Sequence, residues 1–451
     1  QSLTVSAGTD SSNSFDGVGA LSVVQATADD DEEASITARH LTIQIGSANT
    51  VADHHTITAE GKSCVAAVGL CAYSRDGPAS VSLHGEIHLA ADVNSTCGAT
   101  NIISRATGSA AATIGLALFS VASSTSVNIT GSHVTFLGSA TGNSSATAKH
   151  VAATIGVGLR SLSSAATTNI SDSNITFVGS TAGGGNGSSI IAIANGRVAA
   201  TIGMVISSET SSASRIAGSN ITFLGFAAGG GSGSSAISAF GKYYVTTIGM
   251  TLVSSSISVA GSNITFLGSA TGNSSAIAAT ASTEVAATIG MALYSIATTS
   301  ISIAESNVRF MGSAAGSRNT IISAMAIVYH VAATIGMALY THSTSASHIS
   351  IAGSNVTFHG AAMGISSTIS ATANYYVAAS IGMALFSPTS SGYSINIVRS
   401  NVTFLGITTG SSNTISANAA VQPASALGLS ARHLALSNVE LSWCDDGVAA
   451  T

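Results

Sequence analysis

The chain has 451 residues, of which 45% are hydrophobic and only 7% are charged, and its formal net charge at pH 7 is −6. An average soluble domain carries roughly 25% charged residues, so a bare surface of this composition has little to keep it in solution. The sequence shows no basic patch of the kind that binds nucleic acid, and no apolar run long enough for a membrane helix. We therefore expect a surface that glycans hydrate or partners cover, with no nucleic-acid partner and no membrane span.

Residues 1–109 read as degenerate repeats that carry three of the four cysteines. The chain opens at Gln1 without a signal peptide, as expected of a secreted protein after signal removal and equally of a trimmed chain. The acidic run at 29–33 is interpreted as a solvated loop rather than a loose cation site. The histidine pair His54–His55 is interpreted as incidental, so we expect no metal site and no cofactor.

The cysteines match no zinc or redox spacing, and we interpret them as disulfide formers. Three of them lie near one end of the chain and the fourth lies near the other end. A repeat solenoid keeps its ends apart, so the fourth is expected to bond with a cysteine of another chain. The four are Cys64, Cys71, Cys97 and Cys444.

Residues 110–420 repeat regularly, and residues 421–451 form a degenerate last repeat. A glycine in "TIG", or in a degenerate form of it, recurs at intervals of 41–50 residues, and a phenylalanine ends the words "SNVTF" and "SNITF". Fixed anchors with links of variable length are typical of a solenoid, because strands keep register while turns absorb insertions. The glycines are Gly19, Gly69, Gly115, Gly156, Gly203, Gly249, Gly290, Gly336, Gly382 and Gly428; the phenylalanines are Phe136, Phe177, Phe223, Phe266, Phe310, Phe358 and Phe404.

Each period reads as three or four short strands without a helix. In "EVAATIGMALYS" at 284–295, alternation predicts a strand with one face formed by the larger side chains, Val285, Ala287, Ile289, Met291 and Leu293. The other face is small, which indicates that it is closely packed as well. The runs "SISIA" and "VTFLG" predict two further strands, joined at a "GSN" corner where the alternation changes phase.

Short strands that recur in order predict an all-β fold, a parallel β-solenoid of about ten repeats of ~46 residues. The period fits either one wide coil or two ordinary coils of about 23 residues per repeat. Coils lie about 4.8 Å apart, so the body would be roughly 50 or 95 Å long. The repeated glycines allow neighbouring layers to approach closely, and the phenylalanines would form one internal row. A second row would hold Met204, Met250, Met291, Met337 and Met383.

The repeats supply few groups for catalysis. Carbohydrate-active enzymes on β-helices use clustered acidic residues, whereas Asp172, Glu209, Glu284 and Glu305 fall at unrelated positions of the period. The "GxSxG" word of a serine hydrolase is also missing. We expect no catalytic residue and no enzyme; a carbohydrate-active enzyme is a remote alternative that would need turns to gather its acids.

The informative motif is the glycosylation sequon Asn-x-Ser/Thr. Several sequons occupy the same repeat position and would align glycans along one edge of the solenoid. The alternative is an asparagine ladder that stabilises the corner through side-chain hydrogen bonds. The pattern lapses at Asn307, which has no acceptor sequence, and at His133. The sequons are at Asn94, Asn128, Asn143, Asn169, Asn174, Asn186, Asn220, Asn263, Asn273, Asn355 and Asn401.

Threonines also recur in register, as the last residue of the aligned sequons. A flat threonine array on a solenoid is a feature of ice-binding surfaces, which need the array to be bare. Here a sugar on the sequon would cover the array, so ice binding is disfavoured. The threonines are Thr135, Thr176, Thr222, Thr265, Thr357 and Thr403.

The words "SNVTFLG" and "VAATIGMALYS", with the Ala/Ser/Thr/Gly bias of residues 110–440, resemble repeat-rich β-helical surface glycoproteins of flagellate protists. The trypanosomatid dispersed gene family surface proteins are the family that the repeats are similar to. The resemblance implies an extracellular β-helical surface protein, and it implies no particular functional residue.

We therefore expect an extracellular structural glycoprotein that assembles with itself, head to tail, into a filament or surface coat such as a flagellar hair. Uncapped strand edges are templates for another chain, and a head-to-tail contact that does not close generates filaments. Its partners would be further copies, covalent glycans and other surface proteins. The alternative is a cell-surface adhesin that binds carbohydrate or protein through the solenoid face, with Tyr243–Tyr244 and Tyr375–Tyr376 as candidate contacts.

Overall fold

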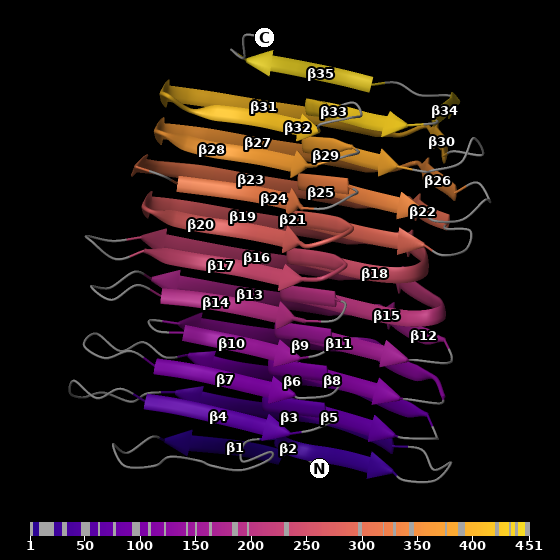
Figure 1. Cartoon of the computed structure of the whole chain (residues 1–451). Coiled ribbons are helices and arrows are strands. Elements are labelled where there is room, and N and C mark those ends of the chain that lie inside the picture. The colour runs from indigo at the N-terminus through magenta and orange to yellow at the C-terminus, as the bar shows by residue number, and fades with distance from the viewer. Residues whose placement is uncertain are drawn as a thin grey trace.

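The protein is a parallel β-solenoid (Figure 1). The computed structural model describes residues 3–8, 22–28, 34–46, 55–61, 64–74, 78–92, 100–106, 110–120, 123–140, 143–148, 151–161, 165–182, 188–195, 198–229, 234–295, 300–318, 320–327, 331–341, 347–374, 377–386, 393–419, 424–432, 434–437 and 441–446. Within these ranges the regular elements are 35 strands, with no helix among them. The predicted all-β solenoid is confirmed.

Each repeat winds once around the solenoid. Gly290 pairs in parallel with Gly249 of the preceding coil and with Gly336 of the following coil. Consecutive repeats are therefore direct neighbours in the sheet, and the solenoid has one wide coil per repeat rather than two ordinary ones. Nine steps of about 4.8 Å give a body about 43 Å long.

A coil consists of four segments, which we number in chain order. The first segments are β2 (Ser22–Ala28), β5 (Cys64–Ser74), β8 (Ala110–Ser120), β11 (Val151–Ser161), the first parts of β15 (Val198–Ala217) and β18 (Tyr244–Ala260), β21 (Val285–Ser295), β25 (Val331–Thr341), β29 (Ala378–Phe386) and β33 (Ala424–Arg432). The second segments are the first parts of β3 (Ala34–Gly46), β6 (Ala79–Asp92) and β9 (Thr125–Ala140), β12 (Ala166–Ser171), the last parts of β15 and β18, β22 (Ser300–Ala304), β26 (Ser347–Ala352), β30 (Tyr393–Val398) and β34 (Leu434–Ser437).

The remaining two segments close the coil. The third segments are β1 (Leu3–Gly8), the last parts of β3, β6 and β9, β13 (Asn174–Ala182), β16 (Asn220–Gly229), β19 (Asn263–Asn273), β23 (Asn307–Arg318), β27 (Asn355–Ile365), β31 (Asn401–Ser411) and β35 (Leu441–Asp446). The fourth segments are β4 (His55–Gly61), β7 (Thr100–Ala106), β10 (Asn143–Ala148), β14 (Ser188–Ala194), β17 (Ser235–Gly241), β20 (Ser275–Ala281), β24 (Thr320–Ala326), β28 (Ser367–Ala373) and β32 (Thr414–Ala419).

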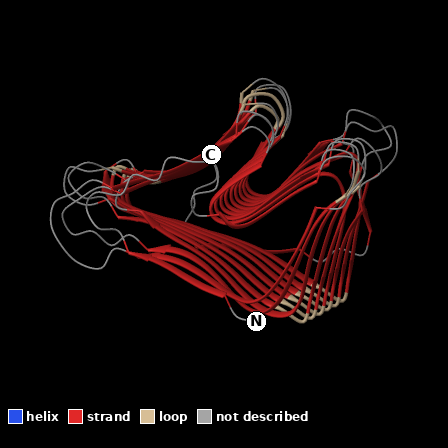
Figure 2. Cartoon of the chain, turned by 90° about the horizontal axis from the view of Figure 1, so that it is seen from below, coloured by secondary structure: helices blue, strands red, loops and turns tan. Residues whose placement is uncertain are grey.

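Strands that run through a corner join the first three segments into one sheet. Because β15 and β18 span the first and second segments, and β6 and β9 span the second and third, these segments form a 26-stranded sheet. The fourth segments form a separate nine-stranded sheet. Figure 2, which looks along the axis, shows the sheets as walls of stacked strands around the coil.

The first segment bends sharply, and this bend shifts its side chains from one face to the other. The ladder between β21 and β25 includes Ala287 and Ile289 but omits Thr288 between them. The omitted residue reverses the alternation, so Val285 and Ala287 lie in a second buried cluster while Ile289 lies in the main core. The predicted single face of larger side chains is therefore wrong for the first half of the strand.

The two arms of the bend face each other. In β18, Thr251 Oγ1 donates a hydrogen bond to Thr246 Oγ1 at 2.6 Å, and Thr246 Oγ1 donates to the carbonyl oxygen of Met250 at 3.2 Å. Small side chains such as Ala287 and Ala292 occupy the space between the arms and are fully buried. This explains why the first segment is apolar on both faces and why the residues between the arms are mostly small.

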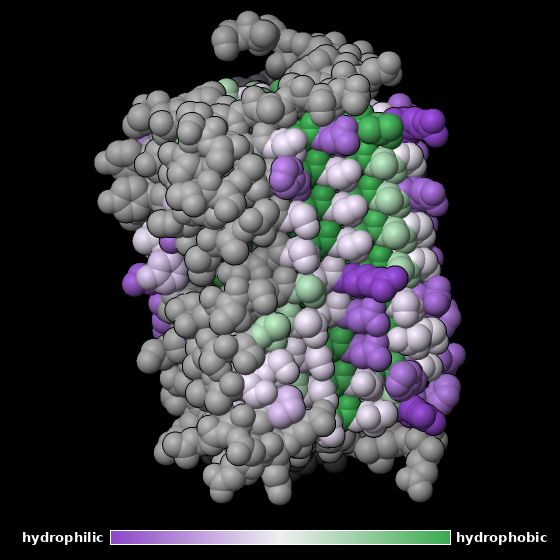
Figure 3. All heavy atoms as spheres, turned by 90° about the vertical axis from the view of Figure 1, so that its right-hand side faces the viewer, coloured by the Kyte–Doolittle hydropathy of each residue, from purple (hydrophilic) through white to green (hydrophobic). Residues whose placement is uncertain are grey.

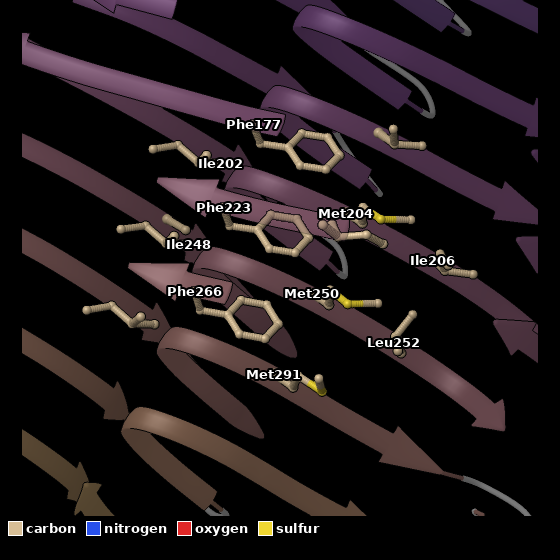
Figure 4. Packing of buried hydrophobic residues seen from close by; sticks show 14 of the residues in the cluster. Phe177, Ile202, Met204, Ile206, Phe223, Ile248, Met250, Leu252, Phe266 and Met291 are labelled. Carbon is tan, nitrogen blue, oxygen red and sulfur yellow. The ribbon is translucent and has the colours of Figure 1, made fainter. Parts of the chain in front are cut away.

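Identical side chains stack in internal columns. The seven repeated phenylalanines are fully buried, with neighbouring ring centroids 4.8–5.0 Å apart and rings within 8° of parallel. The five repeated methionines are at most 2% exposed and form the adjacent column (Figure 4). Both predicted rows are confirmed. On the outside, residues of a kind also run in columns along the axis (Figure 3).

The glycine column begins later than predicted. The paired glycines run from Gly69 to Gly428, and in the preceding coil Ser22 occupies the register position of Gly69. Gly19 itself lies outside the described residues.

Candidate functional site

The corner between the second and third segments carries the aligned sequons, and it is built by a buried serine. The residue before the serine has a left-handed backbone, as in Gly261 (φ +55°) and Glu305 (φ +51°). Ser306 Oγ then donates to the carbonyl oxygen of Ala304 at 2.7 Å, and the Ser306 N–H donates to Ser354 Oγ at 3.1 Å. The same pattern recurs along the axis, so serine hydroxyls tie each corner to the next.

The asparagine after this serine forms a ladder on the surface. The Nδ2 of each asparagine donates to the Oδ1 of the asparagine in the preceding coil, at 2.9–3.1 Å. Asn307 belongs to the ladder although it has no acceptor sequence, so the ladder explains the repeated asparagine without any sugar. Its members are Asn220, Asn263, Asn307, Asn355 and Asn401.

The other sequons lie in several settings. Asn169 Nδ2 donates to Asn128 Oδ1 at 3.2 Å in a second, shorter ladder. Asn174 is exposed and pairs in register with Asn220, whereas Asn273 is partly buried at the end of β19. Asn94, Asn186 and the side chain of Asn143 lie outside the described residues. Glycosylation of these sites stays a prediction.

The spacing of the ladder limits how many of its members can carry sugar. An amide nitrogen carries two hydrogens, and the ladder uses one of them, so the second remains for a glycosidic bond. Consecutive asparagines are only one strand spacing, about 4.8 Å, apart. Branched glycans on consecutive coils would therefore crowd one another more than glycans on alternate coils, which are about 9.6 Å apart.

Two of the repeat-region acids share one place in the coil. Asp172 and Glu305 both hold the left-handed corner position, with φ values of +50° and +51°, and both are exposed. The prediction that they fall at unrelated positions is therefore wrong. They lie three coils, about 14 Å, apart, which is too far for acid/base work on one bond.

The remaining acidic residues and the histidine pair form no cluster of acidic or metal-binding side chains among the described residues. Glu284 is partly exposed before β21, while the side chain of Glu209 lies outside the described residues. His54, the side chain of His55 and the acidic run at 29–33 lie outside them too. In the described part of the chain, no group of three or more His, Cys, Asp or Glu side chains could hold a metal ion.

His359 is the titratable group with the most altered environment. It stands on β27 in register with Met311 and Leu405, in a column that is otherwise apolar. Its Nε2 is buried without a hydrogen-bond partner, and burial lowers the pKa of His359 from its ordinary value. The imidazole is therefore held neutral, in place of an aliphatic side chain.

The cysteines lie at opposite ends of the solenoid. Cys71, on β5, is disulfide-bonded and 1% exposed. Cys444 is on β35 at the far end (Figure 1), so these two are far apart within one chain. Cys97 and the side chains of Cys64 and Cys444 lie outside the described residues, so the pairing of the four stays a prediction.

The candidate tyrosine contacts of an adhesin are only partly described. Tyr244 is 6% exposed and belongs to the second buried cluster, and the partly buried Tyr243 packs against that cluster. Lys242 Nζ lies 5.0 Å from the Tyr243 ring centroid. Tyr375 and Tyr376 lie outside the described residues. The arrangement of Tyr243 and Tyr244 fits packing at the end of the bent strand.

The repeated threonines form an outward column beside the asparagine ladder. Thr265 pairs with Thr222 on one side and with Arg309 on the other, so an arginine interrupts the column. These threonines are only partly exposed. The column is flanked by ladder asparagines and by the apolar column of His359, and it is not a two-row threonine array.

Comparison with known proteins does not assign the chain to a family, because the chain matches no family model, no curated protein and no solved structure. A search of the described residues for a helix long and apolar enough to cross a membrane found none.

Proposed function

We propose that the protein is an extracellular structural element whose coils stack end to end, copy upon copy, into a filament or surface coat. The columns of stacked side chains support this proposal. Phenylalanine, methionine, serine and asparagine columns all run along the axis, so the residues that repeat are those that join one coil to the next. The sequons support an extracellular location.

The observation that carries the proposal is the partly exposed inward face of β32. Among the residues that the structure describes, β32 pairs with β28 only, and at the other end of the same sheet β4 pairs with β7 only. Ile369 and Ala371 of β28 are at most 1% exposed, whereas the inward residues of β32 remain partly exposed. A further coil on β32 would bury them and satisfy its strand edge.

A second copy supplies such a coil. The added layers must present parallel strands with the same pleat. The outermost third-segment strands, β35 at one end and β1 at the other, pair in parallel with β31 and β3 and are built in that way. This contact is heterologous and does not close, so its repetition produces a filament.

Electron microscopy of the purified protein tests the proposal. We expect filaments with an axial repeat of about 50 Å, one molecule per repeat, because each copy adds ten or eleven layers of about 4.8 Å. Ile415→Lys should abolish them, because the ammonium reaches solvent at an open end but would be buried in a stack. Ile415→Leu, which keeps the side chain apolar, should preserve them.

Circular dichroism must show both variants folded. Wild-type protein that stays monomeric at every concentration, or filaments that persist in Ile415→Lys, would overturn the proposal.

A further inference from the structure

Exposed apolar side chains gather on one face of the solenoid. Six large hydrophobic residues in the described part of the chain are at least 36% exposed, and four of them lie on or directly after strands of the nine-stranded sheet. Elsewhere, Ile365 is the last residue of β27 and Val398 lies on β30. The four are Phe240 (42%), Ile321 (37%), Met325 (43%) and Ile327 (41%).

The rest of this face is small and nearly uncharged. Around the large side chains the outward positions of the middle strands hold Ala236, Ser238, Ala276, Ala278 and Thr280. Among the side chains of this face that the structure describes, the exposed charged ones are Arg105, on β7, and Lys242, just past the end of β17. The face is therefore a regular sheet surface with little charge that association would have to desolvate.

The size of the face matches a stable interface. Nine strands about 4.8 Å apart, with six or seven residues of about 3.3 Å each, give an area of roughly 900 Å². A two-fold contact centred on β20 overlaps seven of these strands, roughly 700 Å². A standard protein–protein interface buries roughly 800 Å² on each partner. Within this face the large exposed apolar side chains gather on β17 and at β24, and such a cluster marks an interaction surface.

We propose that this face binds the same face of a second copy, forming a two-fold dimer side by side with the axis at Thr280. Phe240, Thr280 and Met325 are register neighbours in three successive strands. We place the two-fold axis parallel to the strands, at Thr280. Rotation about this axis sets each column of one copy against the same column of the other copy, but reverses the order of the coils along it. Phe240 of each copy then faces Met325 of the other.

The neighbouring column is complementary in the same arrangement. Ala236, Ala276 and Ile321 are register neighbours, so the same axis places Ile321 of one copy against Ala236 of the other. A large side chain thus meets a small one, and the phenylalanine meets a thioether, which is a favourable contact. Two sheets with the same strand spacing pack face to face at about 10 Å, which is why a second copy is the partner that fits.

A charge-swap experiment tests the dimer by analytical ultracentrifugation. Phe240→Lys and Met325→Asp, each alone, should raise the dimer dissociation constant at least about a hundredfold, because each buries two unpaired charges in the dimer. The double variant should recover most of the affinity, since each new ammonium would face a new carboxylate of the other copy. Within one copy the two sites are two coils, about 9.6 Å, apart, so they do not neutralise each other.

Val398→Asp is the matched control, because Val398 is exposed on another sheet and should not change the dissociation constant. A monomeric wild type, or a double variant as weak as the single ones, would overturn the dimer. The lateral contact does not depend on end-to-end stacking. In the Ile415→Lys background, where we expect no filaments, the dimer dissociation constant can be measured alone. A dimer in Ile415→Lys supports the lateral contact whether or not the wild type forms filaments.

Discussion

At the scale of single residues, the glycine of "TIG" is the most constrained position of the repeat. A Cβ added to Gly290, whose φ is +145°, would lie 1.9 Å from the carbonyl oxygen of Gly336. The corner glycine Gly261, with φ +55°, would meet nothing within 4 Å. Both glycines have left-handed backbones, but only the first is also held by contact with the next coil.

This contrast leads to the first prediction. Gly290→Ala should lower the free energy of unfolding by more than about 3 kcal/mol, because backbone in the next coil must move. Gly261→Ala should cost only about 1–2 kcal/mol, the strain of a left-handed alanine. Urea denaturation followed by circular dichroism measures both. Equal losses for the two variants would show that contact in the glycine column is not what constrains Gly290.

The sequence predicted the glycine column and the two internal rows because these residues repeat at fixed spacing. It did not predict the role of Asp172 and Glu305 at the corner. Four other coils have glycine there and one has Arg399, and a shared backbone conformation is invisible in a comparison of side-chain chemistry. The clue was the position itself, immediately before the "SN" of each repeat.

At the scale of elements, the bend of the first segment organises the core. Thr288 is omitted from the ladder, and its Oγ1 donates to the carbonyl oxygen of Ser323 on β24 at 2.5 Å. The equivalent Thr201 and Thr247 make the same bond at 2.7 and 2.6 Å. In five consecutive coils, from Thr154 to Thr334, one threonine thus pins the bend to the nine-stranded sheet across the interior.

The second prediction tests this hydrogen bond. Thr288→Val keeps the shape of the side chain but removes the hydroxyl, and it should lower the free energy of unfolding by about 1–2 kcal/mol. Thr167→Val, at an exposed outward position of β12, should change it by less than about 0.5 kcal/mol. Parallel urea titrations would reveal the difference, and an unaffected Thr288→Val variant would mean that the bend is held by packing alone.

The bend itself could not be read from the alternation. A strand whose two faces are both buried has small apolar residues throughout, so a reversal of phase leaves little trace in the pattern. "VAATIGMAL" looks like one continuous alternation because alanine fits either face. The corner at "GSN", by contrast, could be predicted because its strands have a polar outer face.

At the scale of the whole molecule, the repeat is an exchangeable unit. Equivalent strand residues of successive coils pair with each other, as Val285 does with Val331. The sequence predicted the period of the repeat, but it was compatible with either one coil or two coils per repeat. The spacing of repeated residues gives the length of a repeat and not the number of turns that the repeat makes. The pairing of equivalent glycines resolves this.

The third prediction follows from this equivalence. Deletion of 285–330, one full coil, should leave a folded solenoid that is about 4.8 Å shorter, since residue 331 continues in the register of residue 285. Deletion of 285–306 should prevent folding, because a third segment would follow a fourth. Small-angle scattering and circular dichroism measure the outcome, and a folded half-coil deletion would contradict the assignment of one coil per repeat.

The winding also determines how the molecule would respond to a pulling force. The backbone hydrogen bonds that join coils run along the axis, and β2 and β35 lie at opposite ends of it (Figure 1). Tension along the axis therefore loads one coil boundary at a time. Each coil that detaches replaces a rise of about 4.8 Å with roughly 150 Å of extended chain. The molecule would thus resist compression as a stiff rod. Under tension it would lengthen in large steps of nearly equal size, one coil at a time.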